Sequence, residues 1–333
     1  MNSFGRLFRV QILGESHGSC VGVLLDGCPA GLSLSEEDFE HDLERRRGGG
    51  APGTTPRREE DRPRIESGLF GGRTTGAPLL LLIQNADVDS SAYDALRHTP
   101  RPGHADWVAR VKFGGFEDPR GGGHFSGRLT AALVAAGVVA KKAIAPLRVA
   151  ARLLEAGGEA DTAGAVSRAL EDKDSVGGIV ECRAEGLPAG LGEPFFDSVE
   201  SLIAHAAFAI PAVKGIEFGA GFESARMRGS QCNDEIVDAG GATRTNHAGG
   251  VNGGITNGNP LVFRVAVKPT SSIPRPRKTV DLRTGKTVEI TVGGRHDACI
   301  ALRVPPVLEA VAALVLADLL LLAGRLPRVA GKA

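Results

Sequence analysis

The sequence predicts an α+β fold, a sandwich of packed sheets and helices that forms one compact domain over residues 1–333. Candidate strands and helices follow one another without strict alternation, which disfavours a doubly wound parallel sheet. Hydrophobic residues make up 42% of the 333 positions, enough for a sizeable core, and no segment has the composition of a flexible linker. We therefore expect a single packed domain.

Five segments have the alternating or β-branched pattern of strands: 7–13, 22–25, 79–84, 177–183 and 261–267. Between the predicted elements lie glycine-rich tracts, and the chain holds 46 glycines, about twice the average usage. These tracts are rich in Arg, His, Asn and Thr, so we interpret them as ordered loops that face a ligand.

Four helices are predicted, over residues 35–47, 129–144, 197–208 and 305–322. The first begins with Ser35 and Asp38 at the spacing of a capping box. The last is the most apolar stretch, but it contains Glu309 and Asp318, which would be costly in a bilayer. We interpret it as a buried helix.

Equal numbers of acidic and basic residues, 39 each, give a formal net charge of zero. No overall field therefore attracts nucleic acid or an anionic membrane, and one Trp and one Tyr offer few surfaces for stacking bases. The five cysteines are scattered and odd in number, which argues against a disulfide framework and a zinc site. The N-terminal residues lack the pattern of a secretory signal. These features predict a cytoplasmic protein that binds neither nucleic acid nor membranes.

Four islands of Gly, His and Arg are the most informative motifs. The sharpest is Gly-Glu-Ser-His-Gly at 14–18, directly after a predicted strand, and the others are 101–106, 120–128 and 293–297. Glycine lets the backbone approach a ligand closely, while His and Arg supply titratable and fixed positive charge. The combination predicts an active site that handles anions.

Each motif also has a simpler structural interpretation. His17 can be a hydrogen-bonded histidine in a turn, and Arg101 can pair with Asp106 at the surface. Three glycines and Arg128 at the start of a predicted helix favour a phosphate or carboxylate, although the Gly-Lys-Ser/Thr ending of a Walker motif is missing. The polar residues of 243–258 suit a flat ring with a phosphate tail, or form glycine hairpin turns.

The motifs, in their order along the chain, resemble those of the chorismate synthase family, and the similarity covers nearly the whole sequence. They lie at 14–18, 45–47, 74–78, 101–106, 214–217, 229–231, 246–258, 268–273 and 294–297. The family's reaction is the trans-1,4 elimination of phosphate from 5-enolpyruvylshikimate 3-phosphate, which gives chorismate in the shikimate pathway of aromatic amino acid biosynthesis. It requires reduced FMN without net oxidation. The resemblance implies a single-domain β-α-β sandwich and a homotetramer.

The resemblance also implies roles for individual residues. His17 would protonate or stabilise the departing phosphate, His104 would set the protonation of the reduced flavin, and Asp297 would accept a proton through flavin N5. The substrate would be bound by Arg47, Arg57, Arg101, Ser126, Arg128 and Arg295. The cofactor would be bound by His124, Ser126, Asn246, Gly254, Thr256, Asn257, Lys268, Thr270, Ser271, Ser272 and Arg295.

The sequence departs from the common family pattern at His124-Phe125, where many members have Arg-Ser, at Ala298, where a proline is common, and at Pro52, where a basic residue is lacking. The segment between Arg152 and Ser175 is short for the family. NADP is associated with the family, but no segment indicates a built-in nicotinamide-dependent reductase. We therefore expect reduced FMN from an external flavin reductase or another source.

Two other functions stay open. One is a non-catalytic nucleotide- or phosphate-binding module, in which the arginines hold the ligand and the histidines only form hydrogen bonds. The other is RNA binding through the arginine-rich segment 45–64. A metal hydrolase is disfavoured, because the sequence shows no clustered set of ligands.

Overall fold

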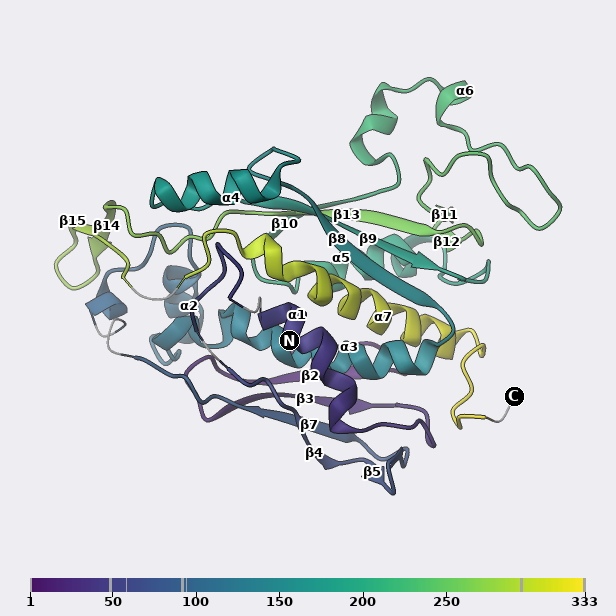
Figure 1. The fold of residues 1–333 in the computed structure, drawn as a ribbon, viewed down its shortest axis with the longest axis horizontal. Helices are drawn as coiled ribbons and strands as arrows, with labels where there is room; N and C mark the ends of the chain where they lie inside the picture. Colours follow the sequence, from purple (N-terminus) through teal and green to yellow (C-terminus); the bar gives the residue numbers. More distant parts are fainter. Residues whose placement is uncertain are drawn as a thin grey trace.

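The computed structural model describes residues 2–47, 50–57, 59–90, 93, 95–293 and 296–331. Two antiparallel sheets enclose a layer of helices (Figure 1). The first sheet has the strand order β1-β2-β3-β7-β4, with bounds Ser3–Phe4, Arg9–Gly14, Cys20–Asp26, Leu79–Gln84 and Arg64–Ser67. The second has the order β10-β13-β9-β8, with bounds Val213–Phe218, Leu261–Val267, Gly178–Glu185 and Arg148–Ala156. This arrangement confirms the predicted α+β class and the β-α-β sandwich.

The middle layer is built around two long helices, α3 (Thr130–Ile144) and α7 (Val304–Leu322). Helix α3 packs on β3 and β7 of the first sheet, whereas α7 packs on β8 and β9 of the second. The two helices approach closely at Gly137, where a Cβ atom would lie 2.5 Å from Cα of Ala310. Two shorter helices complete the layer: α1 (Glu40–Arg47) against α3 and α7, and α5 (Val199–Ala207) against α7 and β10.

The segment Ile300–Leu322 is long and apolar enough to cross a membrane, but 94% of its most apolar window is buried inside the protein. Its two acidic residues are buried with partners. Glu309 accepts hydrogen bonds from Arg45, from Lys141 at 2.6 Å and from the Ala151 amide at 2.9 Å. Asp318 accepts the amides of Arg6, Leu7 and Phe8. The interpretation of this segment as a buried core helix is therefore confirmed.

The predicted strands and helices all exist, and most of their limits move by a few residues. The strand predicted from residue 7 begins at Arg9, because Asp318 takes the amides of residues 6–8. The helix predicted from residue 35 opens with a 3₁₀ turn, Glu36–Phe39, in which the Ser35 amide donates to Asp38 at 2.8 Å. Ser198 caps α5 by accepting the Ser201 amide at 3.0 Å.

Several elements were not predicted. They are the sheet strands β1, β4, β8 and β10, helices α2 (Asp106–Phe113), α4 (Thr162–Glu171) and α6 (Gly229–Cys232), and the two-stranded ribbons β5 (Leu69–Phe70) with β6 (Arg73–Thr74), β11 (Val251–Asn252) with β12 (Ile255–Thr256), and β14 (Arg277–Asp281) with β15 (Lys286–Ile290). Helix α4 occupies part of the segment 152–175 and packs on β8.

Candidate active site

A cavity of about 580 Å³ lies where several loops meet. Its walls come from the loops that follow α1, β2, β7 and β13 and from those that lead into α3 and α7. His17, His104, Arg128 and Asp297, which lie on four separate segments of the sequence, all border it. The fold therefore brings the predicted catalytic residues into one site.

His17 lies in the loop between β2 and β3. Its Nδ1 forms a hydrogen bond of 2.9 Å with the hydroxyl of Ser90, and its ring meets that of Tyr93 edge to face at 5.2 Å between centroids. Burial lowers the pKa of His17, and the guanidinium groups of Arg57 and Arg120 lower it further. The ring is consequently neutral at pH 7 and stands beside fixed positive charge.

His104 is held differently, in the loop that precedes α2. Its Nδ1 lies 2.5 Å from Oδ1 of Asp106, and both Nε and the second terminal nitrogen of Arg101 donate to the same carboxylate at 2.8 Å. The side chain of Arg101 is only 3% exposed, so the pair that the sequence allowed at the surface lies in the interior. A further Arg101 nitrogen donates to the Ser272 hydroxyl at 3.1 Å, which ties this loop to the segment after β13.

Three successive glycines pack against the two histidines. Gly121, Gly122 and Gly123 have φ values of 59°, 83° and 53°, which side chains rarely adopt. A Cβ atom on Gly121 would lie 2.5 Å from Nε2 of His17, and one on Gly122 would lie 3.3 Å from Nε2 of His104. Glycine is thus required for both rings to approach this wall.

Positive side chains from the end of α1 and the segment that follows it also line the cavity. Arg57 donates to Glu59 at 2.6 Å and to the hydroxyl and carbonyl oxygens of Ser16, both at 3.3 Å. Arg47 donates to the carbonyl oxygens of Glu59 and Glu60. Both arginines border the cavity as the substrate-binding prediction requires, and their binding role stays a prediction.

Arg128 lies in a buried cluster with Arg46 and Asp61. Its three guanidinium nitrogens donate to Asn85, to the carbonyl of Gln84 and, in a very short contact, to Asp61. Arg46 donates to the other oxygen of Asp61 at 2.8 Å, and burial lowers the pKa of Arg46 to about 9. Because the protein already binds the donors of Arg128, this residue contributes to the cavity wall mainly through its charge.

Asp297 is one of the acidic residues that border the cavity, and it is 9% exposed. Its Oδ1 accepts the Thr55 amide at 2.9 Å, and its Oδ2 accepts from Arg303 at 3.0 Å. Thr55 and Arg303 also border the cavity. Arg295, for which both a substrate and a cofactor role were predicted, lies outside the described residues.

The segment after β13 fits the polar part of a flavin cofactor. Lys268, Thr270, Ser271 and Ser272 border the cavity, and the Thr270 hydroxyl is buried with no hydrogen-bond partner among the described residues. Lys268 donates to the carbonyl of Gly103 at 3.0 Å. A cation and an unpartnered hydroxyl beside each other are donors for a phosphate or for the polar edge of a flavin ring.

His124 and Ser126 also border the cavity, near the three glycines. The Nδ1–H group of His124 donates to the Gly14 carbonyl at 2.7 Å, and the Ser126 hydroxyl accepts the Arg128 amide at 3.2 Å. Among the described residues no hydrogen bond involves the Nε2 of His124, so this atom can face a ligand.

Four residues predicted to bind the cofactor do not line this cavity within one protomer: Asn246, Gly254, Thr256 and Asn257. They lie around the β11–β12 ribbon, at the opposite end of the molecule from α2 (Figure 1). Thr256 is 2% exposed, and its hydroxyl donates to Pro188 and accepts the Leu191 amide. Asn257 donates to Asn252 at 2.7 Å. Within one protomer these groups hold their own loops together.

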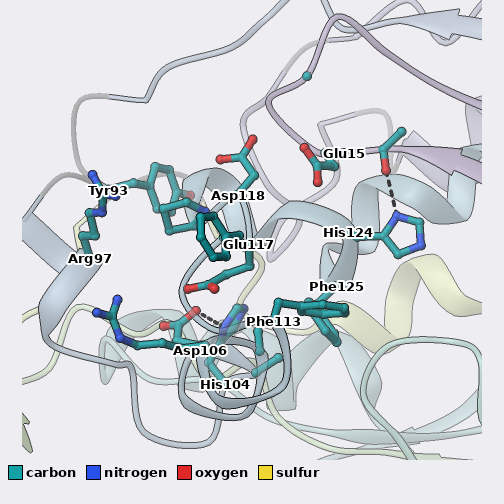
Figure 2. A pocket seen from close by; sticks show the side chains of 18 of the residues that line it. Glu15, Tyr93, Arg97, His104, Asp106, Phe113, Glu117, Asp118, His124 and Phe125 are labelled. Atoms are coloured by element: carbon teal, nitrogen blue, oxygen red, sulfur yellow. Dashed lines mark hydrogen bonds and ion pairs between the residues drawn. The ribbon is translucent and has the colours of Figure 1, made fainter. Parts of the chain in front are cut away.

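His104 also lines a second cavity, of about 710 Å³ (Figure 2). The aromatic rings of Phe113 and Phe125 and the carboxylates of Glu15 and Glu117 line it. Six residues border both cavities: Tyr93, Arg101, His104, Ala105, His124 and Phe125. His104 thus belongs to the wall between them.

Sequence reasoning missed several residues that border the first cavity: Ser16, Arg46, Glu59, Asp61, Tyr93, His296 and Arg303. Ser16 and Arg46 lie within motifs that the sequence did reveal, so a closer examination of those motifs would have found them. Nothing in the local sequence around Asp61 or Arg303 indicates that the fold buries them beside a distant arginine or aspartate.

The fold and the cavity together define a class of β-α-β sandwich proteins in which arginine and histidine side chains line a cavity suited to an anionic ligand. The family model described as chorismate synthase matches residues 8–321. A chorismate synthase of Chitinophaga pinensis is 64% identical over 330 residues, covering 99% of both chains, and one of Dehalococcoides mccartyi is 46% identical, covering 98% of this chain and 99% of the relative. The solved structure titled "Crystal Structure of Chorismate Synthase" superimposes with a TM-score of 0.75 at 29% identity, covering 96% of this chain and 93% of the other. The chain belongs to the chorismate synthase family.

Proposed function

We propose that the protein catalyses the trans-1,4 elimination of phosphate from 5-enolpyruvylshikimate 3-phosphate, giving chorismate, as a carbon-oxygen lyase that requires reduced FMN. In this reaction a C–O bond breaks as phosphate leaves, a C–H bond breaks as a proton leaves, and a new C=C bond forms. The observation that carries the proposal is that His17, His104, Arg128 and Asp297 share one cavity with further cations.

The cations of the site bind and orient the substrate. The substrate carries two carboxylates and a phosphate, and Arg47, Arg57 and Arg101 all border the cavity. The buried charges of Arg46 and Arg128 contribute to the same positive field, partly offset by Asp61. Fixed cations in a site shielded from water stabilise the charge that develops on a departing phosphate.

Titratable groups take part in both proton transfers of the reaction, one to the departing phosphate and one from carbon. His17 is neutral at rest beside Arg57, so a phosphate dianion that arrives next to it favours its protonation, and the ring can then donate a proton as the phosphate leaves. Asp297, which accepts hydrogen bonds from Thr55 and Arg303, is the acceptor for the proton lost from carbon. His104, which borders the same cavity, sets the protonation of the flavin ring.

Lys268, Thr270, Ser271 and Ser272 would hold the cofactor, together with His124 and Ser126. Reduced FMN, when bound, would supply transient electron donation toward the carbon that loses phosphate. Asn246, Gly254, Thr256 and Asn257 remain part of the proposed cofactor site. Because they lie away from the cavity within one protomer, we include the homotetramer in the proposal, in which a second copy brings such a loop to the site. Cytoplasmic location and an external flavin reductase or other source of reduced FMN complete it.

An anaerobic assay tests the proposal directly. Purified protein is mixed with 5-enolpyruvylshikimate 3-phosphate and chemically reduced FMN, and phosphate release and chorismate absorbance are followed together. The proposal predicts that both appear in equal amounts and that oxidised FMN gives neither. Protein that binds flavin and substrate but releases no phosphate would overturn it.

A further inference from the structure

The carboxylate of Asp106 accepts four hydrogen bonds at the wall between the two cavities. Oδ2 accepts the Arg101 amide at 3.0 Å and Arg101 Nε at 2.8 Å. Oδ1 accepts a terminal nitrogen of Arg101 at 2.8 Å and Nδ1 of His104 at 2.5 Å. Figure 2 shows the last of these contacts, with the imidazole held edge-on to the carboxylate. Both oxygens are thus fully used as acceptors.

This set of contacts fixes the tautomer of His104. An ionised carboxylate only accepts hydrogen bonds, so the short contact to Oδ1 requires a hydrogen on Nδ1. The neighbouring Arg101 nitrogen, 3.0 Å from Nδ1, only donates and could serve an unprotonated Nδ1, but that state would place the lone pairs of Nδ1 and Oδ1 against each other at 2.5 Å. Burial alone would raise the pKa of Asp106, but the hydrogen bonds from Arg101 and His104 outweigh it and hold that pKa well below its usual range. The carboxylate is therefore charged throughout the neutral range.

The other ring nitrogen of His104 is left to exchange a proton. Within the described part of the chain, Nε2 has no hydrogen-bond partner, and it faces Gly122, where even a methyl group would lie only 3.3 Å away. Charged groups near the ring among the described residues include Arg101 on its own loop, Lys268, which donates to the carbonyl of the adjacent Gly103 at 3.0 Å, and Glu117, which lines the second cavity with His104. His296 also lies nearby, and its pKa is lowered by burial and to a smaller degree by the charges of Arg101 and His104.

We infer that Asp106 is a positioning residue, which locks His104 in the Nδ1–H tautomer and so presents Nε2 as the atom that gives or takes a proton. The kinetic consequence rests on the proposed function, whereas the tautomer itself does not. Asp106 acts through His104 and need not touch the substrate or the cofactor.

The variant Asp106→Asn tests the inference because its amide group must face one set of donors. If it faced Arg101, it would oppose an amide and a guanidinium, neither of which can become an acceptor. If it faces His104, it still opposes the one terminal nitrogen of Arg101 that donates to Oδ1, but the imidazole adapts by moving its proton from Nδ1 to Nε2, so fewer donors stay opposed than in the other orientation. The variant therefore forces the opposite tautomer while it keeps the size and shape of the side chain.

The tautomer is read by NMR of protein labelled with ¹⁵N at histidine, at a pH high enough to make every imidazole neutral. The His104 signals are assigned by their loss in His104→Gln. We expect Nδ1–H in the wild type and Nε2–H in Asp106→Asn. An Nε2–H tautomer in the wild type would overturn the inference without any variant, so a failure of Asp106→Asn to fold does not protect it.

The kinetic readout is a split between kcat and KM. If the proposed function holds, Asp106→Asn lowers kcat by about 100-fold and leaves KM little changed. The groups that bind the substrate stay in place, but Nε2 of His104 is no longer free to accept a proton. Asp106→Glu, which keeps the charge, recovers part of the rate. A variant with the altered tautomer and full kcat would overturn the positioning role.

Asp281→Asn is the matched control. Asp281 accepts the amide of Arg283 at 2.8 Å and its terminal nitrogen at 3.0 Å, a similar clamp with no histidine in it. We expect its loss to leave kcat unchanged. If the wild type releases no phosphate at all, the proposed function fails, but the NMR result still decides the tautomer.

Discussion

His17 and His104 border the same cavity from glycine-containing loops, yet their surroundings are opposite. His17 is bonded to a neutral hydroxyl, and its burial, together with the charges of Arg57 and Arg120, lowers its pKa. His104 is clamped to a charged carboxylate that Arg101 also holds. The comparison shows that one cavity can provide a histidine that responds to an arriving anion and another whose orientation is set in advance.

The largest expected effect comes from removing either ring. His17→Ala and His104→Ala should each lower kcat by about 10²–10⁴-fold, because each deletes a proton-handling group, while substrate affinity falls far less. Phosphate release under anaerobic conditions measures the first quantity, and equilibrium binding of substrate without FMN measures the second. His41→Ala, at a side chain that is 81% exposed, is the control. Equal losses of turnover and affinity would favour a non-catalytic binding module.

The buried cluster of Arg46, Asp61 and Arg128, which borders the same cavity, provides the next test. Asp61→Asn leaves Arg46 and Arg128 buried without their common counter-charge, so we expect a loss of about 3–5 kcal/mol in the free energy of unfolding. Asp197→Asn, which breaks an exposed pair with Arg6, should cost about 0–1 kcal/mol. Urea unfolding of both variants checks the difference. Similar losses would show that the buried cluster does not stabilise the site.

The glycines at 121–123, which pack against both rings, allow a finer comparison of the two histidines. Gly121→Ala should displace the His17 ring and lower kcat at least tenfold, since the new Cβ would lie 2.5 Å from Nε2. Gly71→Ala has a similar φ, 55° against 59°, and open space around it, so it carries the same backbone cost of roughly 1–2 kcal/mol without the clash. Equal kcat values for the two variants would contradict this account. Gly122→Ala, with its looser contact to His104, should have the smaller effect.

The smallest expected effect is in the pH dependence of stability. The folded-state pKa of His17 lies below the unfolded value of about 6.5, so the unfolded chain binds the proton first and stability falls as pH drops through that value. Asp106 has a depressed pKa, and its contribution is lost only at much lower pH. Urea midpoints between about pH 7 and pH 5 should thus fall less steeply in His17→Gln than in the wild type, whereas Asp281→Asn, at a carboxylate held by Arg283, should leave the slope unchanged.

Much of the fold followed from the sequence because its core elements have strong local patterns. The alternation in β13 and the capping box at Ser35 are local signals, and both elements formed where predicted. Strand β8 was missed although its burial alternates, because its sequence, rich in Ala and Arg, has no clear apolar face. The exact start of β2 depends on Asp318, more than 300 residues away, and no local pattern contains that contact.

The site was predictable only as far as its motifs reach. His17 and His104 were identified from their glycine-rich surroundings, and the fold places both at one cavity. The partner of His104 was visible as a nearby aspartate, but its role required the geometry of four hydrogen bonds. Arg128 was predicted to face a ligand, whereas its donors are bound to Asp61, Asn85 and Gln84, which the chain brings together only on folding.

In the proposed reaction His17 faces the departing phosphate, and an NMR titration of its ring can detect that contact. The ring signals of His17 are followed against pH with and without saturating 5-enolpyruvylshikimate 3-phosphate, in the absence of FMN. The account predicts that the substrate raises the titration midpoint of His17, because a phosphate dianion beside the ring favours its protonated form. An unchanged midpoint with bound substrate would contradict it.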